Sequence, residues 1–250
     1  LGGVHVPHPD LEALGDAPYR LREQLGAIWR QSARFVLAAN EREVPAAALQ
    51  QCDLAGVPLA RIWIERSGLS PRDWVAALFE QSAVPLYHLL CAHGLAVIAH
   101  GQNLGLVLRD SRPTAMILRD FHGDLRRCEA VDFADDDPLI ALTALPDAHA
   151  VHDLYTGYFV SVLRFVGPLL ERSVGLAERE LLTLLRRALE RYRDEHPQLG
   201  RRLEALDLLR PTMARICLNR ARLRPGHGSG SQRPLPVLGP PIINPLAPPP

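Results

Sequence analysis

The sequence has no closely spaced cysteines. Its four cysteines lie far apart, and none belongs to a Cys-x-x-Cys pair: Cys52, Cys91, Cys128 and Cys217. Clustered thiolates hold structural zinc and iron–sulfur centres, so this spacing offers neither kind of site. Because isolated cysteines are typical of a reducing compartment, we expect a cytoplasmic protein.

The chain also lacks net charge and long apolar runs. Its 28 Lys and Arg residues balance 28 Asp and Glu residues, so total charge predicts no nucleic-acid or membrane partner. No apolar run reaches the roughly 20 residues needed to cross a bilayer. The start lacks the charged-then-apolar plan of a signal peptide. Leu1 stands where Met is usual, and we expect a fragment, a processed product or a deliberately trimmed chain.

Hydrophobic residues make up 47% of the chain, enough to bury one sizeable core or two modest ones. Apolar residues at three- and four-residue steps predict helices over 19–40, 44–55, 71–93, 146–170, 176–195 and 200–223. Ser70 and Pro71 are typical of a helix start, and Gly94 of a helix end. Helical spacing of the large aromatic residues indicates core packing: Trp29, Trp63, Trp74, Phe79 and Tyr87.

The period changes in the middle of the chain. Residues 104–108 and 114–118 are short apolar runs separated by the polar turn 109–113, which predicts a β-hairpin. Antiparallel pairing would bring the polar residues before the first strand beside those after the second.

We therefore expect a mainly helical α+β fold, in which a helical bundle supports a small antiparallel sheet. Residues 1–18 form an irregular lead-in, 19–223 form the folded domain, and 224–250 form a mobile tail rich in Pro and Gly. Within that tail, residues 242–246 are expected to dock on the body of the domain.

Two polar clusters adjoin the predicted hairpin, at residues 100–103 and 119–124. Together they contain the residue types that phosphate and Mg²⁺ require, namely donors, an amide or carboxylate oxygen, and glycine for close approach. The donors are His100 and Gln102, the Mg²⁺ ligands Asn103 and Asp120, and the neutralising cation Arg119. Such residues also serve as hydrogen-bonding scaffolding at turns, so the clusters alone leave both interpretations open.

The order Ala99-His100-Gly101-Gln102-Asn103, then a hairpin, then Ile117-Leu118-Arg119-Asp120-Phe121-His122-Gly123-Asp124, resembles the IucA/IucC siderophore synthetases. Upstream, the resemblance extends to residues 19–20, 25–30 and 74–90. Downstream, it covers the helical segment and residues 244–246. It identifies the chain as similar to the carboxyl-terminal half of these enzymes, the palm-like part of an open-hand fold. The family activates a carboxylate with ATP as an acyl adenylate, and an amine, a hydroxamate-bearing amine or an alcohol then attacks.

The resemblance also implies roles for individual residues. His100 and Asp120 are the implied catalytic positions, and Asn103 and Asp120 the implied Mg²⁺ ligands. ATP would be held by His100, Gln102, Asn103, Arg119 and Asp120. Arg30, His122 and Arg126 are the implied contacts to a citrate-like acid or to the amine, although exposure or a structural hydrogen bond explains each equally well.

Two departures from the family pattern bear on this assignment. Ile98 stands where many relatives carry an acidic residue two positions before the histidine. Relatives are also much longer, and their amino-terminal half supplies a phosphate-binding loop that this chain does not contain. We therefore expect the missing amino-terminal half to lie in the same polypeptide or in a separate chain. The sequence does not determine the oligomeric state, and a homodimer is one option.

Two alternatives follow from the same residues. A non-catalytic binding or assembly module would keep the fold without a complete ATP site. A ferric-siderophore reductase would need a cysteine cluster near the carboxyl end, where this chain has Cys217 alone. His149 and His152 are three residues apart, but no third or fourth ligand at suitable spacing accompanies them.

Overall fold

The computed structural model describes residues 3–6, 27–119, 124–217, 223 and 235–248. The chain divides into two compact units. One consists of Leu1–Val36 and Thr212–Ile242, and the other of Leu37–Pro211 and Ile243–Pro250.

The first unit contains two small sheets. β1 (Gly3–Val6) pairs antiparallel with β2 (Ala27–Arg30), and β9 (Thr212–Cys217) pairs with β10 (Val237–Ile243). A short 3₁₀ helix, η2 (Ala33–Phe35), follows β2.

Three predicted helices were wrong in part. The range 19–40 contains β2 and η2, the range 44–55 contains the end of a strand and a 3₁₀ turn, and the range 200–223 contains β9. Apolar residues in short stretches fit either period, and Pro45 and Pro211 lack the N–H that a continuing helix needs.

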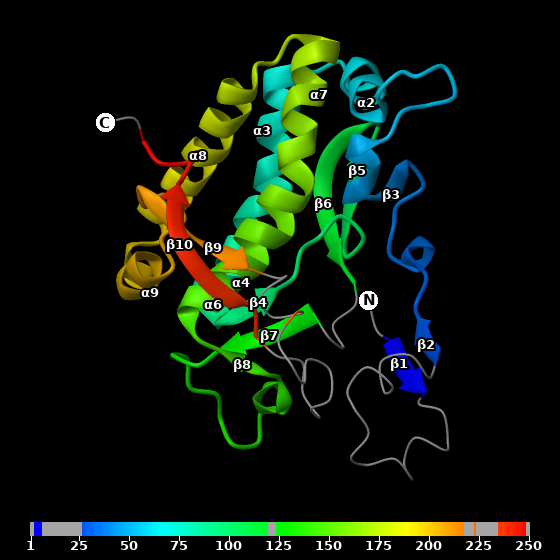
Figure 1. The fold of residues 1–250 in the computed structure, drawn as a ribbon. Helices are drawn as coiled ribbons and strands as arrows, with labels where there is room; N and C mark the ends of the chain where they lie inside the picture. Colours follow the sequence, from blue (N-terminus) through cyan, green and yellow to red (C-terminus); the bar gives the residue numbers. More distant parts are fainter. Residues whose placement is uncertain (1–2, 7–26, 120–123, 218–222, 224–234, 249–250) are drawn as a thin grey trace. The chain divides into compact units, whose positions relative to one another are not determined.

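The second unit is mainly helical (Figure 1). Its helices are η3 (Ala46–Gln50), α2 (Leu59–Ser67), α3 (Pro71–Gln81), α4 (Ala83–His93), η4 (Pro138–Ala141), α6 (Asp147–Leu154), the π-helix η5 (Tyr155–Leu163), α7 (Arg164–Val174), α8 (Glu178–Glu195), η6 (Pro197–Leu199) and α9 (Gly200–Ala205). Figure 1 shows α3, α7 and α8 running side by side, and α3 also packs against the hairpin strand β6.

The predicted start of α3 is confirmed. Ser70 is its N-cap, where the side chain accepts a hydrogen bond from the Asp73 amide, and Pro71 occupies the first turn. The expected helix over 71–93 is interrupted at Ser82. Because Pro85 has no N–H, it cannot bond back to the preceding turn, and the chain restarts as α4. Gly94, with φ of 64°, ends α4 as expected.

Two three-stranded sheets complete the second unit. The first has the order β3 (Glu41–Pro45), β5 (Leu104–Arg109), β6 (Arg112–Leu118), and both pairs are antiparallel. The second has the order β4 (Leu95–Val97), β7 (Leu125–Cys128), β8 (Ala144–Leu145). The α+β prediction and the hairpin over 104–118 are therefore confirmed.

The core of the second unit lies between the helices and the first sheet. Its largest fully buried side chains include Trp74, Phe79, Tyr87 and Tyr158. The prediction of core packing was wrong for Trp29, whose side chain is 71% exposed.

One described helical segment, Pro71–His93, has the length and composition of a membrane span. Half of the tested window is buried inside the fold, and core helices of globular proteins pass the same test of length and composition. That segment is also the pair α3 and α4, which packs against α8 and α6.

The residues after β10 dock on the second unit, as the sequence predicted. Asn244 is 2% exposed, and its side-chain amide donates to the carbonyls of Leu208 and Arg210, each at 2.8 Å. Its side-chain oxygen accepts from the Leu246 amide and from the Tyr155 hydroxyl.

Candidate functional site

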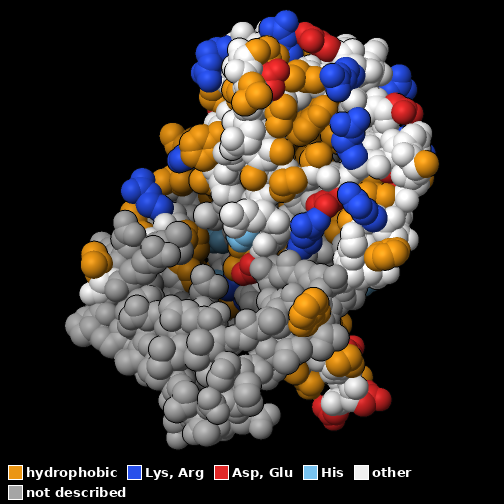
Figure 2. Space-filling model, turned by 90° about the vertical axis from the view of Figure 1, so that its right-hand side faces the viewer, with side chains coloured by type: hydrophobic (Ala, Val, Ile, Leu, Met, Phe, Trp, Pro, Cys, Tyr) orange, Lys and Arg blue, Asp and Glu red, His pale blue; other side chains and the backbone are white. Residues whose placement is uncertain are grey.

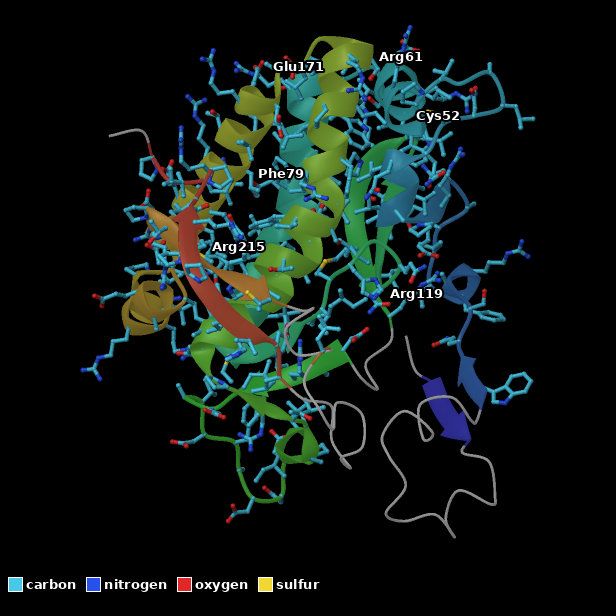
Figure 3. The ribbon with its side chains drawn as sticks, viewed as in Figure 1. Cys52, Arg61, Phe79, Arg119, Glu171 and Arg215 are labelled. Atoms are coloured by element: carbon cyan, nitrogen blue, oxygen red, sulfur yellow. The ribbon has the colours of Figure 1, made fainter. Side chains whose placement is uncertain are left out.

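The hairpin brings its two polar ends together. Leu104 is paired with Leu118, and the Arg119 amide donates to the Asn103 carbonyl at 2.9 Å. Figure 3 shows Arg119 just beyond the lower end of β6. The expected meeting of the two clusters is thus confirmed for Asn103 and Arg119, while Asp120 and His122 lie outside the described residues.

A tight turn carries His100 and Gln102 into the hairpin. The amides of Asn103 and Leu104 both donate to the His100 carbonyl, at 2.9 and 3.2 Å. Gly101 lies against η3, where its carbonyl accepts from the Ala47 amide at 2.8 Å. A Cβ at Gly101 would lie 2.9 Å from that same nitrogen, so the turn needs glycine for this close approach.

The tautomer of His100 follows from its neighbours. Its Nδ1 accepts from the Gln102 amide at 3.3 Å, so in the neutral ring the proton sits on Nε2. Nε2 lies 3.8 Å from the Asp124 Oδ2 atom, too far for a hydrogen bond but close enough for electrostatic attraction. The His100 side chain is 36% exposed, so a ligand can reach it.

Asn103 is buried and held in one orientation. Its side-chain amide donates to Asp124 and to the Ile98 carbonyl. Since both N–H groups point into the protein, the amide oxygen is the atom left for a ligand.

The second sheet joins the strand before the histidine to the strand after the acidic cluster. The Ile98 amide donates to the Asp124 carbonyl at 2.9 Å, directly after the pairing of β4 with β7. This pairing places the Asp124 carboxylate beside His100 and Asn103. Sequence reasoning missed Asp124 as a site residue, although it closes the polar cluster that begins at Arg119.

Arg126 is engaged by a carboxylate from α6. Its guanidinium forms a two-point ion pair with Asp153, and the two side chains are 15% and 8% exposed. The Asp153 carbonyl also accepts from the Ala99 amide at 3.4 Å. Arg126 therefore ties β7 to α6, and its predicted contact with a substrate carboxylate would have to compete with Asp153.

The π-helix η5 packs against the strand that leads to His100. Gly157 is buried, and a Cβ there would lie 3.1 Å from the Ala99 nitrogen. One turn earlier, burial and the neighbouring His149 lower the pKa of His152 to about 4. π-helical turns are frequent at functional sites, and this one lies against the residue before His100.

A third carboxylate approaches from β3. Glu43 forms an ion pair with Arg119, and the Glu43 side chain is 10% exposed. No sequence signal identified Glu43, because a glutamate in a short polar stretch is usually solvated.

The remaining predicted residues are less informative. Gln102 is exposed beside His100. Arg30 lies in β2 of the first unit, and its side chain is outside the described part of the chain. Within the described residues, no group of three or more His, Cys, Asp or Glu side chains could hold a metal ion.

Comparison with known proteins identifies relatives over nearly the whole chain. Residues 72–230 match the family model described as "Ferric iron reductase FhuF-like transporter". The chain is 39% identical over 247 residues to aerobactin synthase of Escherichia coli, covering 97% of this chain and 42% of that protein.

Solved structures give the same result. The chain resembles aerobactin synthetase IucC of Klebsiella pneumoniae with a TM-score of 0.76 and 39% identity, over 91% of this chain and 40% of the other. ATP-bound aerobactin synthetase IucA from the same organism has a TM-score of 0.65 and 17% identity, over 90% and 40% of the two chains, a likeness of fold alone. The chain thus spans about two fifths of the length of these proteins.

Proposed function

We propose that this chain carries one side of the site at which a siderophore synthetase binds ATP. The chain belongs to the IucA/IucC family of these enzymes. The reaction would be ATP-dependent joining of a citrate-like carboxylic acid to an amine, a hydroxamate-bearing amine or an alcohol. The observation that supports this proposal is the meeting of His100, Asn103, Asp124 and Arg119 at the open end of the hairpin.

The donor set suits a magnesium nucleotide in part. Mg²⁺ prefers oxygen ligands and is usually held by one or two protein groups together with phosphate oxygens and water. The Asn103 amide oxygen and the Asp124 carboxylate provide such ligands, and Asp120, outside the described residues, is the third candidate. When bound, the ion would neutralise charge on the phosphates.

The protein's own side chains would bind and orient the phosphates. The side chain of His100 is 36% exposed, so its Nε2–H would donate to a phosphate oxygen, and Gln102 adds an exposed amide. The guanidinium of Arg119 supplies a fixed positive charge at the same end of the hairpin. Held in this way, the α-phosphorus would lie in line with the attacking carboxylate, pyrophosphate would leave, and the amine would then displace AMP.

The rest of the site is proposed to come from elsewhere. Because the chain spans about two fifths of its relatives' length, a further segment or a partner chain would complete the phosphate site. Arg30, His122 and Arg126 remain candidate contacts to the acid or the amine. A cytoplasmic location fits a biosynthetic ligase of this class, and a homodimer is one arrangement to test.

Carboxylate-dependent exchange of radiolabelled pyrophosphate into ATP tests the reaction class in the full polypeptide that carries this chain. An acyl-adenylate mechanism predicts exchange that needs both a polycarboxylate such as citrate and Mg²⁺. Release of ADP and phosphate in place of exchange would contradict it. Nucleotide binding without exchange by any acid tested would favour the non-catalytic module.

The reductase alternative has a separate test. It predicts a coloured protein with visible absorbance from an iron centre. A colourless purified protein that catalyses the exchange would dispose of it.

A further inference from the structure

Arg119 is aligned by a carboxylate from a strand that is not its neighbour. In the sheet order β3, β5, β6, the residue Glu43 lies on β3, whereas Arg119 directly follows β6. The whole width of β5 separates the two backbones. Nevertheless the Glu43 side chain forms an ion pair with the Arg119 guanidinium.

A missing side chain on β5 makes this contact possible. Gly105 is paired with Pro45 on one side and with Ile117 on the other, so it lies between the two partners. A Cβ built at Gly105 would lie 2.2 Å from the Glu43 Oε1 atom. Any other residue at position 105 would therefore occupy the path that Glu43 takes across the sheet.

The environment of Glu43 indicates more than a surface ion pair. Its side chain is nine-tenths buried, and its Oε1 atom is buried without a hydrogen-bond partner among the described residues. Leaving a buried carboxylate oxygen unsatisfied costs free energy, and sites that accept such a cost are commonly functional. The Arg119 side chain is 35% exposed, which leaves its other N–H groups open to a ligand.

We propose that Glu43 is a positioning residue, which reaches across Gly105 to hold the Arg119 guanidinium toward an anionic ligand, the nucleotide phosphates, at the end of the hairpin. This inference rests on the proposed function for the identity of the ligand. The alignment of Arg119 itself rests on the geometry of the sheet alone.

Strand β3 and its direct neighbour β5 contain a second ion pair that serves as a matched control. Glu41, two residues before Glu43 on β3, pairs with Arg109 of β5 at 2.6 Å. That pair joins directly neighbouring residues near the turn end of the hairpin, and the Arg109 side chain is 53% exposed. Glu41→Gln therefore removes a similar carboxylate from the same strand, away from the polar clusters.

Calorimetric titration with MgATP compares Glu43→Gln with Glu41→Gln. We expect Glu43→Gln to weaken nucleotide binding about tenfold, equivalent to about 1.4 kcal/mol, and Glu41→Gln to leave it unchanged. Equal affinities in the two variants would overturn the inference. Absence of binding by the unsubstituted protein would instead contradict the proposed function.

A second readout needs no nucleotide. The Arg119 Nε–H signal in ¹H–¹⁵N spectra, assigned by its loss in Arg119→Lys, should be sharp in the parent protein and in Glu41→Gln, because the ion pair restricts the guanidinium. It should broaden in Glu43→Gln. A signal that is unchanged by Glu43→Gln would overturn the positioning role, whatever the result with ATP.

A double-mutant cycle tests the path across β5. Gly105→Ala should lower nucleotide affinity and broaden the Arg119 signal in the parent protein, because the new methyl group displaces Glu43. In a Glu43→Ala background the same change should have little further effect. Additive effects of the two substitutions would show that Gly105 and Glu43 act separately and would overturn this part of the inference.

Discussion

At the scale of single residues, His152 is the side chain whose burial makes the clearest prediction. The residue is 5% exposed, with its Nδ1 atom 3.0 Å from the Thr156 hydroxyl and its ring edge-on to Tyr155. Burial, with a smaller contribution from His149, lowers the folded-state pKa from 6.5 to about 4. The neutral imidazole is therefore the form that the fold accommodates.

Stability should consequently fall as the solution is acidified. The unfolded chain takes up the proton near pH 6.5, whereas the folded protein does so only near pH 4. The stabilisation from neutral His152 is complete above about pH 6.5 and is lost as the pH falls from 6.5 to about 4. The total loss in the free energy of unfolding is at most about 3 kcal/mol. Urea denaturation of His152→Leu and the parent at several pH values checks this. If the free energy of unfolding changed with pH in the same way in both proteins, groups other than His152 would cause the loss of stability.

Part of the candidate site could be predicted from the sequence, and the rest could not, for a physical reason. His100, Asn103 and Arg119 were found because they stand beside an apolar hairpin, and the register of that hairpin fixes where they meet. Glu43 and Asp153 come from distant parts of the chain. Their pairing with Arg119 and Arg126 depends on tertiary packing, which the spacing of residues along a sequence does not encode.

At the scale of secondary-structure elements, the π-helix η5 and the strand before His100 are in direct contact. Gly157→Val should destabilise the fold by about 2 kcal/mol. The Cβ of the new side chain would lie only 3.1 Å from the Ala99 nitrogen, so the valine must push the Ala99 backbone away. It should also weaken nucleotide binding, since Ala99 precedes His100. Chemical denaturation and calorimetry measure the two effects.

Gly200 supplies the matched control in α9, where a Cβ meets nothing within 4 Å. Gly200→Ala should be neutral or stabilising by up to about 1 kcal/mol, with nucleotide binding unchanged. If Gly157→Val bound ATP like the parent protein, η5 would not set the position of the turn that carries His100.

The elements that could be predicted are those with a clear period or clear end signals. Ser70, Pro71 and Gly94 mark ends that the structure reproduces, and the long amphipathic α8 lies over 178–195 within the expected range. The break at Ser82 and the strands β2 and β9 were missed. Short apolar stretches do not distinguish a strand from a helix until their pairing partners are known.

At the scale of the whole molecule, the segment that follows β10 is held to the rest of the second unit through Asn244. Its side chain makes four hydrogen bonds in a site that is 2% exposed, with Leu208, Arg210, Leu246 and Tyr155. Asn244→Ala should therefore cost about 2 to 3 kcal/mol, because two backbone carbonyls lose their donor. Urea denaturation measures this cost.

A control for this prediction lies at the outer end of the same segment. Ile243 is 85% exposed, so Ile243→Ala should change stability by less than about 0.5 kcal/mol. Equal costs for the two substitutions would show that Asn244 does not fasten the segment.

The central claim is that the open end of the hairpin binds a magnesium nucleotide, and calorimetric titration of this 250-residue chain with MgATP tests it most directly. We predict measurable binding that weakens at least about tenfold in Asn103→Ala, whose amide both orients Asp124 and offers an oxygen ligand, and that persists in Glu41→Gln. Absence of heat at millimolar nucleotide, or equal affinity in Asn103→Ala and the parent chain, would contradict the account.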